Sequence, residues 1–376
     1  MSRGRPRPRT PKAVRRPAVP PGGSLPADPR PPSPSAETAA FVAGLPKAEL
    51  HVHHVGSASP RIVAQLASRH PGSQVPEDPA ALAEYFTFTD FRHFVRVYLS
   101  VVELLTDAED IRLLTYEIAR DMARQRIRYA ELTVTPASST SRGISLGAFL
   151  EAIEDARKAA EAEFGVVLRW IFDIPGPAGE EAAEETLRAA VEHAPDGLVG
   201  FGLGGPEAGV PRARFKPYFD RARAAGLRSV PHAGETGGPE EVRAAVDELG
   251  AERVGHGIAA VRDPLLLAEL VDRGVVLEVC PTSNVATRAV PSLAAHPLPQ
   301  LAAAGVPIAL GSDDPPMFGT DLNTEYGIAA ALCGLDAAGV AALAEESVRA
   351  SFLDEPGKRR LLEEIRAHLD AWHPAP

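Results

Sequence analysis

Strand-like and helix-like runs alternate along this chain from about residue 39 to its end. Eight runs are rich in β-branched and apolar residues, and Ala-, Glu- and Leu-rich segments with helical spacing separate most of them. A helix between successive strands is typical of parallel pairing, because parallel strands need a long crossover connection. The predicted strands are residues 47–53, 127–133, 166–173, 197–203, 227–232, 253–256, 275–280 and 306–311.

Eight such strands with intervening helices predict a (β/α)₈ TIM barrel. The longest insertion, residues 59–125, follows the first strand, and we expect several helices that roof the mouth of the barrel. An open, doubly wound sheet is the alternative fold. The first strand is not followed by the G-x-G-x-x-G sequence that would favour that alternative.

The first 38 residues differ from the rest of the chain. They contain eight Lys and Arg against two Asp and Glu, and eleven prolines. We therefore expect a disordered N-terminal arm over residues 1–38 and one barrel domain over residues 39–376. A basic arm can touch nucleic acid or anionic lipid. Removing its charge of +6 from the total of −11 leaves −17 on the barrel, which argues against nucleic acid as the main partner.

Polar side chains gather where the predicted strands end. His51 and His53 occupy alternate positions, so both point to the same side of the first strand. Active sites of TIM barrels lie at the carboxyl ends of the strands. The sequence therefore predicts one site assembled from His51, His53, Gly205, His232, His256 and Asp313.

Three histidines and a carboxylate form a plausible zinc shell that leaves room for a water molecule. The expected ligands are His51, His53, His232 and Asp313, around one zinc ion per subunit. Zinc lowers the pKa of a bound water to about 7, which supplies hydroxide at neutral pH. Iron or manganese can also be bound through imidazole.

Three further residues are placed to act beside such a metal. His256 is expected to take or steer a proton of the water. Glu235, three residues after His232, is a candidate general acid if burial raises its pKa. Asp314 is expected to bind the substrate.

Five motifs together resemble those of the adenosine deaminase family of the amidohydrolase superfamily, over residues 45–360. They are P-K-A-E-L-H-V-H at 46–53, H-A-G-E at 232–235, G-H-G at 255–257, C-P-T-S-N at 280–284 and S-D-D-P at 312–315. The resemblance implies hydrolytic removal of the 6-amino group of a purine, with release of ammonia. It implies the same four zinc ligands as above. Residues 200–207 lack the lysine that bridges two metals in binuclear relatives, which favours a single metal.

The resemblance also implies the contacts of the purine. Glu235 would protonate the ring nitrogen next to the attacked carbon, and His256 would orient the hydroxide. Asp314 would bond the nitrogen on the imidazole side, and Gly205 would donate its backbone N–H to the far ring nitrogen.

The chain departs from the family pattern directly after the second histidine. The family usually continues with Leu-Asp-Gly or Leu-Glu-Gly, whereas this chain has His54-Val55-Gly56. In nucleoside-cleaving members the acid accepts a hydrogen bond from the ribose 5′-hydroxyl, which Val55 cannot do. The variant resembles the bacterial branch that acts on aminodeoxyfutalosine, an adenine nucleoside with a benzoate-bearing 5′ chain on the futalosine route to menaquinone.

For such a substrate, Asp173 is expected to bind the ribose, and His53 is expected to contact the substrate as well as the metal. An arginine at the mouth, Arg142 or Arg288, would meet the benzoate, because arginine pairs with carboxylates through two parallel bonds.

Three other functions compete with this prediction. Adenosine or adenine deamination in purine salvage would use the same chemistry. A catalytically inactive deaminase-like binding protein is disfavoured, because every ligand and the general acid are present. A zinc hydrolase of esters or phosphoesters is disfavoured, because Glu235 and Asp314 would both address ring nitrogens.

The remaining predictions concern surroundings and partners. Two cysteines and no apolar run long enough for a membrane span predict a cytoplasmic protein. The expected partner is a small purine nucleoside, with no nucleic acid and no membrane. No feature of the sequence predicts an oligomeric state.

Overall fold

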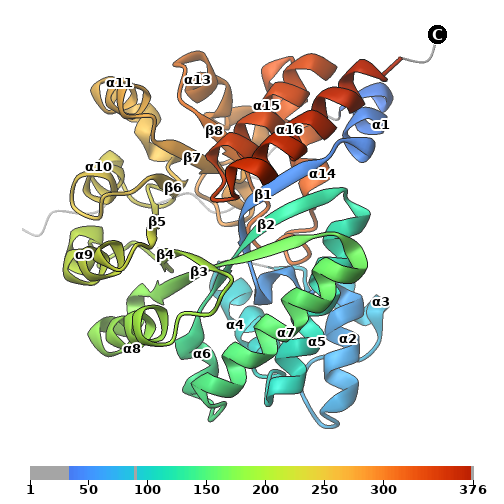
Figure 1. The fold of residues 1–376 in the computed structure, drawn as a ribbon, viewed down its shortest axis with the longest axis vertical. Coiled ribbons are helices and arrows are strands. Elements are labelled where there is room, and N and C mark those ends of the chain that lie inside the picture. The colour runs from blue at the N-terminus through green and yellow to red at the C-terminus, as the bar shows by residue number, and fades with distance from the viewer. Residues whose placement is uncertain (1–33, 89–90, 374–376) are drawn as a thin grey trace, which may run out of the picture. The chain divides into compact units, whose positions relative to one another are not determined.

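The computed structural model describes residues 34–88 and 91–373. Eight parallel strands pair in sequence order, and an isolated parallel bridge from Val52 in the first strand to Asp313, just after the eighth, closes the barrel. In Figure 1 the strands run through the middle and the helices are ranged around them. The strands are β1 (Lys47–His53), β2 (Ile127–Val134), β3 (Val167–Pro175), β4 (Leu198–Gly204), β5 (Arg228–Ala233), β6 (Arg253–His256), β7 (Val276–Val279) and β8 (Ile308–Leu310).

Every predicted strand is confirmed to within about two residues at each end, and the TIM barrel is therefore confirmed. The helices are α1 (Ala36–Gly44), α2 (Pro60–Arg69), α3 (Pro79–Tyr85), α4 (Phe91–Val102), α5 (Ala108–Arg124), α6 (Pro136–Thr140), α7 (Leu146–Phe164), α8 (Gly179–Glu192), α9 (Lys216–Ala224), α10 (Pro239–Asp247), α11 (Pro264–Arg273), α12 (Pro281–Ala286), α13 (Leu298–Ala303), α14 (Leu322–Cys333), α15 (Ala337–Ala350) and α16 (Glu355–Asp370).

Local sequence sets the ends of many helices. Helix α7, for example, begins where the Ser145 side chain accepts a hydrogen bond from the Ala148 N–H, and it ends at Gly165 with a left-handed φ of 67°. A serine cap satisfies one of the free N–H groups of the first turn, and glycine adopts the left-handed end without a Cβ clash. These signals are readable from sequence, which is why the alternation predicted the fold.

The interior of the barrel is polar and the core lies outside it. Along β1, Leu50 and Val52 are fully buried and belong to the apolar core between the strands and the helices. The alternate side chains of Glu49 and His51 are also buried, but inside the barrel, where Glu49 bonds Ser312 after β8 and His51 bonds Glu278 in β7. A strand places successive side chains on opposite faces, so β1 separates the apolar layer from the polar interior.

The insertion after β1 consists of the helices α2 to α5, as predicted. Helix α4 packs against the short 3₁₀ helix η1 (Val55–Ser57), which directly follows β1. The insertion therefore lies at the end of the barrel where the strands finish.

One helix begins within the segment that was predicted to be a disordered arm. Helix α1 starts at Ala36, within the predicted arm of residues 1–38, because the Ser35 side chain caps the N–H of Thr38. The prolines up to Pro34 conceal this cap in the sequence. Phe41 anchors the helix against His368 and Trp372 of the C-terminal segment. The remaining residues of the predicted arm, 1–33, lie outside the described residues.

Within residues 34–88 and 91–373, no helix combines the length and the apolar character needed to span a bilayer.

Candidate metal centre and active site

The four predicted metal ligands meet at the carboxyl ends of β1, β5 and β8. His53 Nε2 lies 3.1 Å from His232 Nε2 and 3.1 Å from Asp313 Oδ1. His51 Nε2 lies 3.7 Å from the same Asp313 oxygen. Ligand atoms at 2.0–2.1 Å from a tetrahedral zinc ion are about 3.3 Å apart, so the observed separations match the edges of such a shell.

Two ring nitrogens of this group have no hydrogen-bond partner. His51 Nε2 and His232 Nδ1 are buried and unpaired. Buried polar atoms are usually satisfied, and a group left unpaired is costly. Asp313 also has a left-handed φ of 65°, as has His256 at 59°. Non-glycine residues in this region are strained and cluster at functional sites. His232 faces the cluster through Nε2 and not through Nδ1, so of the two unpaired ring nitrogens it is His51 Nε2 that, with the donor set and the spacing, fits a metal ion.

A second layer of residues orients these ligands. Glu278 Oε2 lies 2.9 Å from His51 Nδ1, and Arg253 Nε donates to the other oxygen of Glu278 at 2.6 Å. Arg253 also bonds Glu131, so a buried charged row runs beneath the histidines. Ser283 Oγ donates to Asp313 Oδ2 at 2.5 Å. These contacts leave His51 Nε2 and Asp313 Oδ1 directed at the same point.

The electrostatic field at this point favours positive charge. Burial lowers the pKa of His51, but the Asp313 and Glu278 carboxylates outweigh it and raise the pKa to about 10. Burial also lowers the pKa of His53, which Asp313 and Asp314 raise to about 9. The pKa of His232 falls well below its usual value because of burial and the neighbouring histidines. His232 is thus neutral with a lone pair available, and the cluster as a whole attracts a cation.

His256, at the end of β6, joins the same cluster. One ligand atom each from His51, His232, His256 and Asp313 lie within 4.8 Å of one another. This compact group contains His256 in place of the predicted ligand His53. His53 has the shorter separations of 3.1 Å, whereas His256 Nε2 lies 3.9 Å from Asp313 Oδ2 and 3.7 Å from Glu235 Oε2. The spacing favours His53 as the ligand and His256 as a neighbour of the reacting groups.

Glu235 is held rigidly on the loop after β5. The buried carboxylate of Glu207 accepts the backbone N–H groups of residues 234–237 at 2.7–3.1 Å, and Thr287 Oγ1 donates to Glu235 Oε1 at 2.8 Å. Burial raises the pKa of Glu207, but these N–H groups outweigh it and lower the pKa. The carboxylate of Glu235 therefore has a fixed position beside His256.

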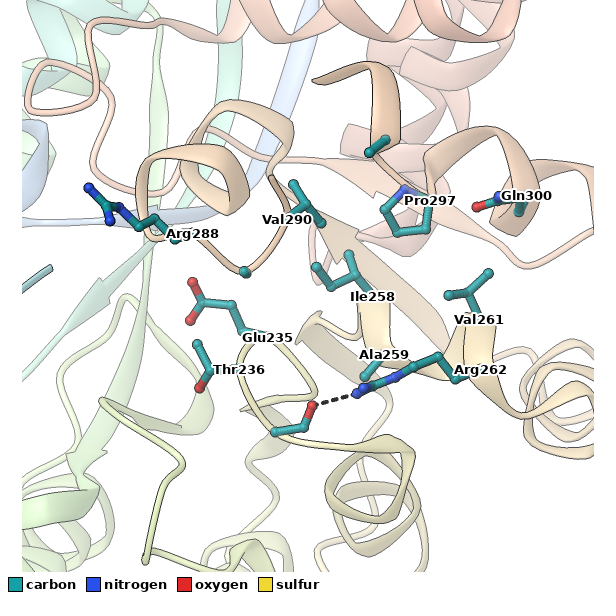
Figure 2. Close-up of a pocket in the computed structure, with 13 residues that line it drawn as sticks. Glu235, Thr236, Ile258, Ala259, Val261, Arg262, Arg288, Val290, Pro297 and Gln300 are labelled. Carbon is teal, nitrogen blue, oxygen red and sulfur yellow. Dashed lines mark hydrogen bonds between the residues drawn. The ribbon is translucent and has the colours of Figure 1, made fainter. Parts of the chain in front are cut away.

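A cavity of about 370 Å³ adjoins Glu235. Figure 2 shows Glu235, Thr236 and Arg288 along one side of it, and Pro297 and Gln300 along the other. None of the four predicted metal ligands lines this cavity, so among the proposed reacting groups it adjoins Glu235 alone.

Asp314 directly follows the ligand Asp313 and lies within electrostatic reach of His53 and His51. Its side chain is buried and its Oδ1 has no hydrogen-bond partner. A Cβ at Gly56 would lie 1.6 Å from that oxygen, so only glycine fits there. Burial and the charge of Asp313 raise the pKa of Asp314 to about 7. Asp314 thus offers an unsatisfied carboxyl oxygen, as a ligand-binding group would.

The two remaining predicted substrate contacts lie beside each other at β3 and β4. Gly205 has a φ of 83°, and its carbonyl accepts a hydrogen bond from Arg212 Nη2 at 3.3 Å. Asp173 is buried and accepts from Thr135 Oγ1 at 2.5 Å. A Cβ at Gly204 would lie 2.7 Å from Asp173 Oδ2. The structure therefore brings all the predicted site residues to one end of the barrel.

Val55 lies in a second, small cavity of about 20 Å³ at the mouth of the barrel. Arg142 lines this cavity together with Tyr98, Thr135 and Phe149. Burial lowers the pKa of Arg142 from its usual value. Arg288, the other predicted mouth arginine, lines the separate cavity beside Glu235. His54 points away from the metal cluster and pairs with Thr115 at 2.8 Å, as its alternation with His53 indicates.

Several residues that position the ligands and the reacting groups were not predicted from the sequence. Glu278 is an acid within an apolar predicted strand, which was a readable signal for a buried polar contact. Asn284 belongs to the C-P-T-S-N motif but received no role. His296 belongs to none of the motifs, yet it is buried and bonds Asn284 at 3.1 Å. Glu207 gave no signal, because its four N–H partners come from a loop distant in the sequence.

Comparison with known proteins agrees with this geometry. The adenosine deaminase family model matches residues 46–368. The aminodeoxyfutalosine deaminase of Streptomyces coelicolor is 66% identical over 89% of this chain and 87% of its own. The crystal structure of an adenine deaminase from Arthrobacter aurescens superposes with a TM-score of 0.82 at 33% identity, covering 87% of this chain and all of its own.

A third relative is an amidohydrolase from Burkholderia ambifaria whose structure contains bound zinc. It superposes with a TM-score of 0.81 at 26% identity, over 90% of this chain and 96% of its own. Family motifs, fold and the convergent histidines all lead to one assignment: this chain belongs to the adenosine deaminase family.

Proposed function

We propose that this protein catalyses the zinc-dependent hydrolytic deamination of aminodeoxyfutalosine to futalosine and ammonia, in the cytoplasm, as a step of menaquinone synthesis. The observation that carries the reaction is the convergence of three histidines and Asp313 on one point, with Glu235 beside them. The choice of substrate is supported by sequence identity. This chain is 66% identical to the aminodeoxyfutalosine deaminase of Streptomyces coelicolor and 33% identical to the adenine deaminase from Arthrobacter aurescens.

His51, His53, His232 and Asp313 would hold one zinc ion. When bound, the ion lowers the pKa of a coordinated water and so supplies a nucleophile at neutral pH. Glu278 keeps the Nδ1 proton of His51 engaged, so the Nε2 lone pair faces the metal position. Trace iron or manganese would occupy the same imidazole ligands.

The remaining groups bind the purine around this point. Glu235 protonates the ring nitrogen next to the attacked carbon, held in place by Thr287 and by the Glu207 clamp on its loop. Asp314 bonds the imidazole-side nitrogen through its unpaired Oδ1. Gly205 donates its N–H to the far ring nitrogen, because its left-handed φ lets the backbone face the ligand.

The ribose and the 5′ chain extend toward β3 and η1. Asp173 binds the ribose hydroxyls, and His53, the most exposed of the metal ligands, contacts the substrate. Val55 leaves the 5′ position without a carboxylate, so an acidic 5′ chain meets no repulsion there. Arg142 is favoured over Arg288 for the benzoate, because Arg142 shares a cavity with Val55.

That cavity holds no more than about one water molecule, so the 5′ chain must displace its lining side chains. Tyr98 of the helical insertion lines this cavity together with Val55 and Arg142. Arg142→Met should raise the KM for aminodeoxyfutalosine about tenfold or more, since a charged pair contributes about 1.5–3 kcal/mol. Arg288→Met is the matched control, with little change expected in KM.

The reaction itself is tested by ammonia release and product analysis with the zinc-loaded protein. Aminodeoxyfutalosine should give futalosine and one equivalent of ammonia. Glu235→Gln should bind zinc normally and lose activity by about 10²-fold or more, as expected for a general acid. The exposed Glu248→Gln serves as the control. Full activity of Glu235→Gln would remove the proposed proton donor.

A further inference from the structure

His256 is the end point of a chain of hydrogen bonds that starts at a backbone amide. The N–H of Leu298, the first residue of α13, donates to His296 Nδ1 at 3.1 Å. His296 Nε2 lies 3.1 Å from Asn284 Oδ1 in α12. The amide nitrogen of Asn284 in turn lies 3.1 Å from His256 Nδ1.

The donor and the acceptor of every hydrogen bond in this row are determined by its first group, the Leu298 N–H. A backbone N–H can only donate, so His296 Nδ1 accepts and its Nε2 carries the proton. That proton requires an acceptor, which is Asn284 Oδ1, and the amide NH₂ of Asn284 is then left to donate to His256 Nδ1. In the neutral ring of His256, the proton must therefore reside on Nε2.

The chain is shielded from solvent along its whole length. Asn284, His296 and His256 are all at most 3% exposed. Burial, followed by the nearby His256, lowers the pKa of His296 to about 4, so His296 stays neutral and able to accept. Two acceptors lie near His256 Nε2, the carboxylates of Glu235 and Asp313 at 3.7 Å and 3.9 Å. The hydrogen bonds at Nδ1 of His256 and the acceptors near its Nε2 are therefore consistent with the same tautomer, the one with the proton on Nε2.

We propose that Asn284 and His296 are positioning residues that hold His256 as its Nε2–H tautomer, a hydrogen-bond donor to the reacting oxygen. A ring nitrogen that carries a proton cannot ligate a metal or act as a base. The relay therefore excludes His256 from the metal shell that it borders. It also assigns His256 to steering the attacking oxygen and not to removing its proton.

The tautomer is tested without substrate, whereas its catalytic consequence rests on the proposed function. Long-range ¹H–¹⁵N spectra of the zinc-loaded protein with ¹⁵N-labelled histidine report which nitrogen of each ring is protonated, and His256→Gln assigns the signal. The relay requires a protonated Nε2 and a bare Nδ1 for both His256 and His296. A protonated Nδ1 on His256 would overturn the proposal, whatever the enzyme deaminates.

Asn284→Asp tests the consequence. A carboxylate only accepts, so it should force the proton of His256 onto Nδ1 and lower kcat by about 10³-fold or more, with KM and zinc content little changed. Asn323→Asp makes the same change in the first turn of α14, at a residue that takes no part in the relay, and should retain kcat. Equal kcat values for the two variants would contradict a positioning role.

His296 provides a rescue experiment if Asn284→Asp fails to fold. Glutamine can accept from the Leu298 N–H and donate to Asn284, so His296→Gln should keep kcat within about tenfold of wild type. Leucine can do neither, so His296→Leu should lower kcat by a further tenfold or more and allow the Asn284 amide to turn over. If the spectrum of His296→Leu shows His256 in the same tautomer as in the wild-type protein, the relay does not determine that tautomer.

Discussion

His51 in β1 and Glu278 in β7 are joined inside the barrel by a contact of 2.9 Å between Nδ1 and Oε2. Arg253 donates to the other oxygen of Glu278 and also bonds Glu131. Glu278 is therefore fixed as an acceptor, and His51 must present its Nε2 lone pair to the metal position. The orientation of a ligand from the first strand thus depends on a carboxylate that the sequence places 227 residues away.

Glu278→Gln should weaken zinc binding. The amide NH₂ would face either His51 Nδ1–H or Arg253, and each of these is a donor. A lost outer partner of a metal-ligating histidine costs about 10- to 100-fold in metal affinity. Competition with a chelator of known affinity measures the Kd for zinc. Glu252→Gln, in the partly exposed pair with Arg228, should leave the Kd unchanged. A wild-type Kd for Glu278→Gln would show that this contact does not organise the site.

Gly56→Ala should damage activity without loss of metal. Its Cβ would lie 1.6 Å from Asp314 Oδ1, so the Asp314 side chain has to move out of the position assigned to it beside the purine. Displacement of a positioning group by about an ångström lowers kcat/KM by about 10²-fold. Gly147→Ala in the first turn of α7 is the control, because its Cβ meets nothing within 4 Å. Equal kcat/KM for both variants would mean that Asp314 does not touch the substrate.

Val55→Asp should shift specificity from aminodeoxyfutalosine toward adenosine. The new carboxylate can accept a hydrogen bond from the ribose 5′-hydroxyl, and it would repel an acidic 5′ chain. The ratio of the two kcat/KM values is expected to change by about 10²-fold, since each effect contributes about 1.5 kcal/mol or more. Val55→Thr, of similar size and without charge, should leave the ratio within about threefold. An unchanged ratio in Val55→Asp would place the 5′ group elsewhere.

Glu325→Gln should change the pH dependence of stability. Burial raises the pKa of Glu325 to about 7, against the hydrogen bonds from Thr282 and Thr320. Between pH 4.5, the ordinary pKa of a glutamate, and about pH 7, the folded protein binds the extra proton, so this group makes stability fall as pH rises through that window. The variant should therefore lose less stability than wild type between pH 5 and pH 8, by at most about 3 kcal/mol.

Urea unfolding of both proteins at the two pH values measures this difference. The glutamine amide can keep the Thr282 N–H and the Thr320 hydroxyl as partners, so folding should be preserved. Glu363→Gln, at an exposed position of α16, should follow the wild-type pH dependence. Parallel pH profiles for Glu325→Gln and wild type would show that Glu325 is ionised in the folded protein at pH 5.

Much of the fold could be predicted from the sequence because its signals are local. The strands are short apolar runs, and glycines such as Gly165 and Gly274 mark helix ends by adopting a left-handed φ. Residues predicted for the site were also found together, since each of them stands at the end of a strand. The boundary between arm and barrel was predicted at residue 39, whereas α1 starts at Ala36, because its Ser35 cap adjoins a proline-rich stretch that is typical of a disordered arm.

The supporting residues could not be predicted in the same way. Glu207, Glu278 and His296 act through partners on other strands or loops, and no local pattern connects an acid in β7 with a histidine in β1. Tautomers and lone-pair directions follow only from three-dimensional hydrogen bonding. The sequence could therefore predict which residues meet, whereas the structure was needed to show how each is oriented.

The assignment of aminodeoxyfutalosine as the substrate is most directly tested by kcat/KM for aminodeoxyfutalosine and for adenosine. Both are measured side by side with the zinc-loaded protein through the ultraviolet change of the purine. We expect kcat/KM to be several hundredfold higher for aminodeoxyfutalosine than for adenosine, because the site has Val55 in place of an acid and Arg142 in the same cavity. Equal or faster turnover of adenosine would contradict the substrate assignment and return the enzyme to purine salvage.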